Sequence, residues 1–221
     1  MTRFTTLAPR NTAVALATLS LCLGLACSPT AHAATPAQFQ TAYELFEQAQ
    51  QGQAIDTAAQ RFQALADAEP TDGVLRTYAG SAGAMRARTT WLPWKKMGYA
   101  EDGLAQIDKA LAQLRPADDA PRYRGTPASL EVRFTAASTF LALPSMFNRH
   151  ARGQKLLAEV MASPLFEASP VGFKGAVWLR AGVEAADNNQ PAEARAHLQR
   201  IIQAQAPQAA AAQTRLQELA K

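Results

Sequence analysis

The 221-residue sequence predicts an all-α fold, and three observations support this prediction. Alanine accounts for 49 residues, while valine and isoleucine together supply only 11. Aromatic residues make up 7% of the chain, so the β-branched and aromatic residues that favour sheets are scarce. The abundant types, among them Ala, Leu, Gln, Glu and Arg, lose little side-chain entropy in a helix. With 48% hydrophobic residues, the chain has enough apolar surface to form a packed core.

Residues 1–33 are interpreted as a secretory signal peptide. Two arginines and no acidic residue precede an apolar run over residues 13–26, and Ala31-His32-Ala33 forms an A-x-A cleavage signature. The alternative is a buried N-terminal helix, since the apolar run is shorter than the roughly 20 residues that span a bilayer. A signal peptide predicts a periplasmic or secreted protein, cleaved after Ala33, with one domain over residues 34–221.

Both cysteines, Cys22 and Cys27, lie in this leader. Residues 23–27, Leu-Gly-Leu-Ala-Cys, resemble the box that precedes an acylated cysteine in bacterial lipoproteins, so a lipid anchor at Cys27 is the alternative to a soluble product. Membrane contact is expected only if Cys27 is acylated. Removing Arg3 and Arg10 leaves 20 basic residues against 18 acidic ones, a net charge of +2. This charge gives no basis for nucleic-acid binding.

Residues 34–221 contain a series of predicted amphipathic helices that pair into helical hairpins. Apolar or small residues at three- and four-residue spacing predict the first two helices, which Gly52 separates and Pro70 ends: Ala42, Leu45, Phe46 and Ala49, then Ala58, Phe62, Leu65 and Ala66. A second pair covers residues 75–87 and 99–111, with a long connection at Thr89–Trp94. A third pair covers residues 130–143 and 153–161.

The clearest hairpin lies near the C-terminus. Trp178, Ala181 and Gly182 are expected on its first helix, and Pro191 suits the first turn of the second. The small residues Ala181, Gly182 and Ala194 allow the two helices to approach closely. Trp178, Leu198 and Ile201 are expected to fill the interface between the two helices. A final helix over residues 208–220 carries mostly polar residues around Leu216 and Leu219, as expected of a helix that caps an array.

These hairpins resemble the tetratricopeptide repeat (TPR) family, whose units place bulky, small and aromatic residues in a set order and close on Pro. Residues 38–70 and 178–207 carry the resemblance best, and residues 85–165 depart from the pattern. The resemblance implies a solenoid of about four hairpins with a C-terminal capping helix, and an unrelated helical bundle is the alternative. Some TPR domains hold a partner's C-terminal carboxylate with Lys and Asn. Groove-facing positions such as Thr77 and Ser81 offer neither residue.

Motifs for catalysis, metal binding and phosphate binding are not found in the sequence. After the leader, only His150 and His197 remain, in different predicted repeats, and His197 is interpreted as a surface or partly buried helix residue. No HExxH, GxxxxGK[ST] or GxSxG motif occurs. We therefore expect no enzyme activity, no metal and no cofactor.

A cluster of aromatic and cationic residues interrupts the alanine-rich array. Tryptophan and arginine anchor protein interfaces, and tryptophan beside cations also suits membrane headgroups. The alternative is that the tryptophans fill the gap left by the long connection. A second basic group consists of Arg133, Asn148, Arg149, His150 and Arg152. Within it, Arg133 is expected either to pair with an acid such as Glu101 or Asp102 or to line the groove. The candidate partner-binding residues are Arg86, Arg88, Trp91, Trp94, Lys95, Tyr99 and Arg133.

The sequence as a whole predicts an exported, non-catalytic scaffold or adaptor that binds a protein or peptide partner in the cell envelope. Two alternatives stay open. One is an envelope assembly factor anchored through Cys27, and the other is a binder of small molecules or polymers that uses the Trp91–Tyr99 cluster.

Overall fold

The computed structural model describes residues 1–2 and 34–220 of the chain. The predicted signal sequence from residue 3 onward, with Cys22, Cys27 and the cleavage site, lies outside the described residues. The described part is helical, with 76% helix and no strand, which confirms the predicted all-α class. All of its helices belong to one compact unit, Ala31–Lys221.

The described residues form ten α-helices and three short 3-10 helices. In chain order these are α1 (Pro36–Gln50), α2 (Ile55–Ala68), α3 (Gly73–Met85), η1 (Arg86–Arg88), α4 (Pro93–Ala112), η2 (Pro116–Asp119), α5 (Ala128–Ala142), η3 (Ser145–Phe147), α6 (His150–Ala162), α7 (Pro164–Glu167), α8 (Val171–Asp187), α9 (Pro191–Gln203) and α10 (Ala209–Glu218). The predicted hairpins correspond to α1–α2, α3–α4, α5–α6 and α8–α9. Most boundaries differ by one to three residues, and the largest difference is at α4, which begins at Pro93 and so includes Trp94, which the sequence placed in a connection.

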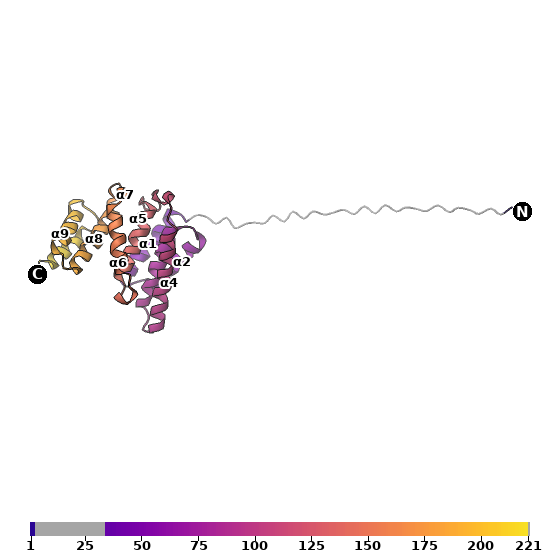
Figure 1. The fold of residues 1–221 in the computed structure, drawn as a ribbon, viewed down its shortest axis with the longest axis horizontal. Coiled ribbons are helices and arrows are strands. Elements are labelled where there is room, and N and C mark those ends of the chain that lie inside the picture. Colours follow the sequence, from indigo (N-terminus) through magenta and orange to yellow (C-terminus); the bar gives the residue numbers. More distant parts are fainter. Residues whose placement is uncertain (3–33, 221) are drawn as a thin grey trace. The chain divides into compact units, whose positions relative to one another are not determined.

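Most helices pack against their neighbours in sequence. The partners within pairs are α1 and α2, α3 and α4, α5 and α6, and α8 and α9. The first helices of successive pairs also touch, because α3 packs against both α1 and α5, and α5 packs against α8. At the C-terminal end, α10 packs on α9 and α8 (Figure 1).

Local signals fix where these helices begin. Thr35 and Gln38 form a capping box at α1, so each side chain bonds the other's backbone N–H. The buried Asp72 carboxylate accepts hydrogen bonds from the backbone N–H groups of Val74 and Leu75 at the start of α3. A proline in the first turn starts α1, α4, α7 and α9, where its missing N–H has no intrahelical partner to lose.

The core is a series of three connected apolar clusters. Side chains of α1, α2 and α3 build most of the first, with a few from α4 and α5. Side chains of α4 to α8 build the second, and those of α9 and α10, with Ala206 between them, build the third. Leu111 packs against the first two clusters and Trp178 against the last two. Because α3 lies among several helices, Thr77 and Ser81 are buried, and the Ser81 hydroxyl lies 2.7 Å from that of Thr139 on α5. Their expected exposure in a groove is therefore wrong.

Glycine permits the closest helix crossings. A Cβ atom on Gly80 of α3 would lie 2.6 Å from the Gly103 carbonyl oxygen of α4, so the two backbones touch there. A Cβ on Gly153 would lie 2.8 Å from Leu141, and one on Gly182 would lie 3.0 Å from Leu198. Gly182 and Leu198 therefore play the parts that the sequence predicted for them at the α8–α9 crossing.

Candidate partner-binding surface

Helix α4 projects beyond the helices around it. It contains 20 residues against 13 in its partner α3, a difference of about 10 Å at 1.5 Å per residue. Figure 1 shows one end of α4 extending past the neighbouring helices. The first four residues of α4, Pro93–Lys96, are all exposed, and the first buried residue is Ala100. The beginning of α4 is thus presented to solvent.

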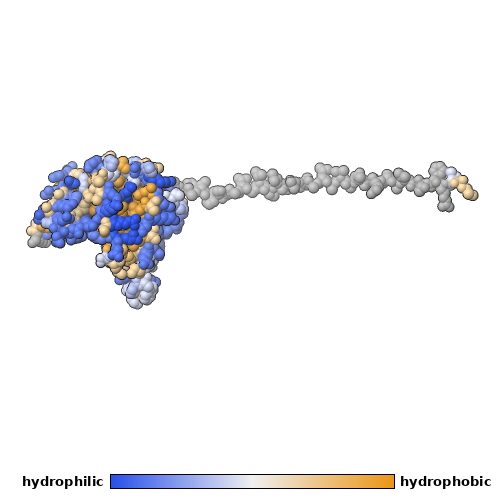
Figure 2. Space-filling view, viewed as in Figure 1, coloured by the Kyte–Doolittle hydropathy of each residue, from blue (hydrophilic) through white to orange (hydrophobic). Residues whose placement is uncertain are grey.

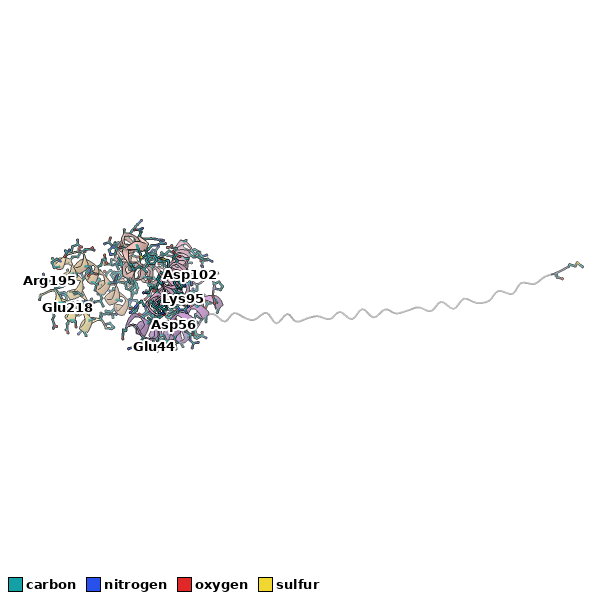
Figure 3. The ribbon with its side chains drawn as sticks, turned by 90° about the horizontal axis from the view of Figure 1, so that it is seen from below. Glu44, Asp56, Lys95, Asp102, Arg195 and Glu218 are labelled. Carbon is teal, nitrogen blue, oxygen red and sulfur yellow. The ribbon has the colours of Figure 1, made fainter. Side chains whose placement is uncertain are left out.

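The two tryptophans at this end are among the most exposed large hydrophobic residues of the described chain. Trp91 is 82% exposed and Trp94 is 66% exposed. The alternative that they fill a gap in the packing is therefore wrong. Lys95 and Lys96, which follow directly, are also exposed. We call Trp91, Trp94, Lys95 and Lys96 the tryptophan tip; the view in Figure 3 is from below, toward the projecting end of α4, and labels Lys95.

The remaining predicted residues near the tip attach its base to the first hairpin. Arg86 pairs with Asp56 of α2 at 2.8 Å, and its guanidinium lies 4.3 Å from the centre of the Tyr99 ring. Arg88 donates to the Gln50 carbonyl oxygen at 3.5 Å, at the C-terminal end of α1. Arg86, Arg88 and Tyr99 therefore hold the start of α4 against α1 and α2.

Arg133 makes its contacts elsewhere. On α5, it donates to the Ser129 carbonyl oxygen at 3.2 Å and lies 4.0 Å from the Glu159 carboxylate of α6. The expected pairing with Glu101 or Asp102 is wrong, because both lie on α4 whereas the Arg133 side chain turns toward α6. The structure gives Arg133 no contact with the tip among the described residues.

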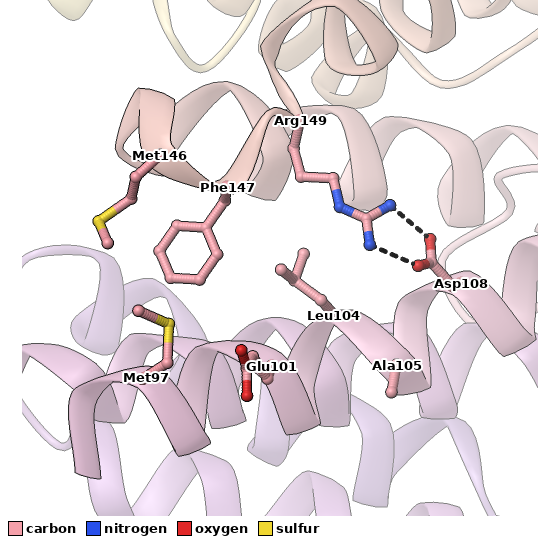
Figure 4. Close-up of a pocket in the computed structure, with 8 residues that line it drawn as sticks. All are labelled: Met97, Glu101, Leu104, Ala105, Asp108, Met146, Phe147 and Arg149. Carbon is pink, nitrogen blue, oxygen red and sulfur yellow. Dashed lines mark hydrogen bonds and ion pairs between the residues drawn. The ribbon is translucent and has the colours of Figure 1, made fainter. Parts of the chain in front are cut away.

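A cleft runs beside the tip, between α4 and η3. It has a volume of about 490 Å³, and Figure 4 shows Met97 and Glu101 of α4 facing Met146 and Phe147 of η3. Met146 is 65% exposed. Trp94, Met97 and Glu101 follow one another at three- and four-residue spacing, so they lie on one face of α4. The cleft is therefore continuous with the face that carries Trp94.

The inner end of the cleft is closed by an ion-pair cluster. Arg149 donates from its two terminal guanidinium nitrogens to Asp108 of α4, at 2.9 and 3.4 Å (Figure 4). Arg152 pairs with the same carboxylate. Both guanidinium groups also lie over the Phe140 ring, 5.5 and 5.3 Å from its centre. Arg149 and Arg152 of the second basic group thus join the start of α6 to α4 and α5.

A second loop, residues 120–127 between η2 and α5, carries aromatic and cationic residues that sequence reasoning missed. Tyr123 stacks on Phe39 with ring centres 4.4 Å apart and donates to Asp72 at 2.5 Å. Arg122 pairs with Asp72 at 2.8 Å and with Glu69 at 3.3 Å. Burial, followed by the hydrogen bond to Asp72, raises the pKa of Tyr123 well above its usual 10.

Arg124 in the same loop reaches a buried carboxylate. It donates to Glu131 at 2.9 Å, and its guanidinium lies 3.7 Å from the centre of the Tyr43 ring. Glu131 is 1% exposed and also accepts from the Tyr78 hydroxyl at 2.9 Å. Burial raises the pKa of Tyr78, and the Glu131 charge raises it further. We call residues 120–127 the locked loop.

The two histidines contact single carboxylates. His150 lies 3.1 Å from Glu184, which also accepts from Gln154 and Asn188, so this carboxylate joins α6 to α8. His197 is buried, more so than the sequence suggested, and burial followed by the nearby Arg200 charge lowers its pKa. Residues 1–2 and 34–220 hold no group of three or more His, Cys, Asp or Glu that could bind a metal.

No protein-family model, curated protein or solved structure matches the chain. None of the helices within the described residues has the length and hydrophobicity needed to cross a membrane.

Proposed function

We propose that this chain is an exported, non-catalytic adaptor built from TPR-like helical hairpins, and that it binds a protein partner in the cell envelope. The single observation that carries the binding role is the apolar surface at α4 and η3. Met146 is 65% exposed beside a cleft that Met97 and Phe147 also line. Methionine is a flexible, polarizable residue that fits varied apolar partners.

Helix packing supports the repeat part of the proposal. The first helices of successive pairs contact one another, as stacked hairpins require, and α10 covers the last pair. Gly80 of α3 and Gly182 of α8 each allow close approach from the first helix of a pair, and Gly153 of α6 does so from a second helix. The shared use of Gly80 and Gly182 on first helices supports a repeated unit.

The contacts of the arginines favour a binding cleft centred on apolar side chains, and they argue against a cationic binding groove. Arg86 and Arg133 are each near a carboxylate of their own chain, and Asp108 engages both Arg149 and Arg152. These charges are therefore partly neutralised before any partner arrives. Glu101 is the exposed charge within the cleft itself, and it favours a partner segment that carries a basic residue beside its apolar anchors.

Site-specific photo-crosslinking in cells tests this function. A crosslinking residue at Met146 should capture one defined protein, and Met97→Glu should reduce that capture about tenfold or more, because a charge would then enter the apolar contact. The matched control places the crosslinker at Val171, which is 43% exposed at the start of α8. Equal capture at both positions, or capture unaffected by Met97→Glu, would contradict a partner site in the cleft.

A further inference from the structure

We infer that the tryptophan tip is a membrane-binding site that inserts its indole rings at the headgroup level of an anionic bilayer. This inference uses residues that the proposed cleft does not need, so either can fail without the other. It also departs from the expectation that membrane contact requires an acylated Cys27, because the contact comes from the folded domain.

The chemistry of the tip matches a bilayer interface. Tryptophan has an apolar ring and one N–H donor, a combination that prefers the boundary between hydrocarbon and headgroups. Trp91 and Trp94 are 82% and 66% exposed, and Lys95 and Lys96 stand next to them to contact lipid phosphates. A helix that begins at Pro93 adds the positive end of its dipole at the same place.

The charge around the tip selects an anionic surface. No acidic residue occurs between Asp72 and Glu101, whereas five basic residues do. Arg86 is paired with Asp56, but Lys95 and Lys96 are exposed at the end of the projection. The negative potential of anionic lipids attracts such lysines over about a Debye length.

The size of the tip favours a bilayer over a protein. A stable protein interface takes roughly 20–30 residues from each side. The tip and the two residues between its tryptophans span only residues 91–96, at the end of a projecting helix, and in Figure 2 the projecting part of the molecule ends in pale, near-neutral residues. A membrane contact needs only a few interfacial side chains together with cations.

Tryptophan fluorescence with lipid vesicles tests the inference. The full chain carrying Cys27→Ser, which excludes acylation, is mixed with vesicles of phosphatidylglycerol and phosphatidylethanolamine. Residues 1–33 contain no tryptophan, so they cannot produce an emission shift themselves. We expect a blue shift that is lost when Trp91 and Trp94 are both changed to Phe, since only the half-buried Trp178 then remains.

Charge variants show whether the tip itself selects the anionic surface. Lys95→Gln with Lys96→Gln should lower the vesicle partition coefficient about 25-fold, at about fivefold per lysine. Lys109→Gln with Lys155→Gln removes the same charge from exposed positions outside the tip and should change it less than about twofold. Phosphatidylcholine vesicles and soluble glycerophosphate should give little shift.

Three results would overturn the inference. The first is no blue shift with the anionic vesicles, and the second is an equal loss in both pairs of lysine variants, which would indicate only net charge. The third is a crosslinker at Trp94 that captures a single envelope protein and no lipid in cells, which would make the tip a protein contact.

Discussion

The tryptophan tip lies at the start of α4 and the locked loop lies between η2 and α5, and the two regions make different contacts. Both combine aromatic rings with cations. Tyr123 of the locked loop stacks on Phe39, whereas Trp91 of the tip is 82% exposed. Arg124 reaches a buried carboxylate, whereas Lys95 is exposed. A segment rich in aromatic and cationic residues can therefore either be exposed or stabilise the fold through internal contacts, and its composition alone does not tell which.

The difference comes from where acidic residues stand. Glu69, Asp72 and Glu131 lie next to the locked loop and neutralise its arginines. The segment around the tip has no acidic residue over residues 73–100. The arginines of the locked loop pair with carboxylates of the same chain and so stabilise its fold. The lysines of the tip have no acidic residue close to them in the sequence and can contact another molecule.

Removing one charge from each region should give the largest contrast in stability. Arg124→Ala leaves the buried Glu131 carboxylate with Tyr78 as its remaining donor, so we expect a loss of about 3–5 kcal/mol in the free energy of unfolding. Lys95→Ala removes an exposed charge and should change it by less than about 0.5 kcal/mol. Urea unfolding followed by circular dichroism measures both. Similar effects for the two variants would remove the distinction between locked and exposed cations.

The helices of this fold could be predicted from the sequence because their signals are local. Stripes of small and apolar residues, with Gly52, Pro70 and Pro191 at the breaks, predicted all four hairpins. The locked loop was missed because its partners are distant in sequence: Tyr123 and Asp72 are 51 residues apart. The local signals, Pro121, Gly125 and Pro127 within the loop, indicate only a turn.

Exposure of the tip could not be predicted for a different reason. Whether Trp91 and Trp94 fill a gap or face solvent depends on how far α4 extends past α3, and helix lengths are known only to within a few residues from sequence. The lack of acidic residues over residues 73–100 does not separate Lys95 from Arg86, because both lie in that segment and Arg86 pairs with Asp56 of α2. Whether a cation finds a carboxylate depends on tertiary contacts that the sequence does not show.

Glycine substitutions separate the packed part of α4 from its projecting end. A Cβ on Gly103 would collide with the Gly80 carbonyl oxygen and with Ala84, so Gly103→Ala should cost about 1–3 kcal/mol of unfolding free energy. A Cβ on Gly98 would meet nothing within 4 Å, so Gly98→Ala should stabilise the helix by about 0.5–1 kcal/mol. Thermal unfolding measures both. A destabilising Gly98→Ala would mean that the end of α4 is packed against something.

Removing one hydroxyl from the locked loop gives a smaller effect with a distinctive pH dependence. Tyr123→Phe keeps the ring on Phe39 but loses the hydrogen bond to Asp72, so we expect a loss of about 1.5 kcal/mol at pH 7. The folded state raises the pKa of Tyr123 above 10, so the stability from this hydroxyl is complete below pH 10 and declines as the pH rises above 10.

The difference in unfolding free energy between wild type and Tyr123→Phe should therefore shrink above pH 10, because only the wild type must keep a proton on this hydroxyl. Urea unfolding at pH 7 and at pH values above 10 measures the difference. Trp91→Phe, the matched change at the tip, should leave the unfolding free energy within about 0.5 kcal/mol of wild type at both ends of that range. No cost for Tyr123→Phe at pH 7 would show that the ring on Phe39, and not the hydroxyl on Asp72, holds the loop in place.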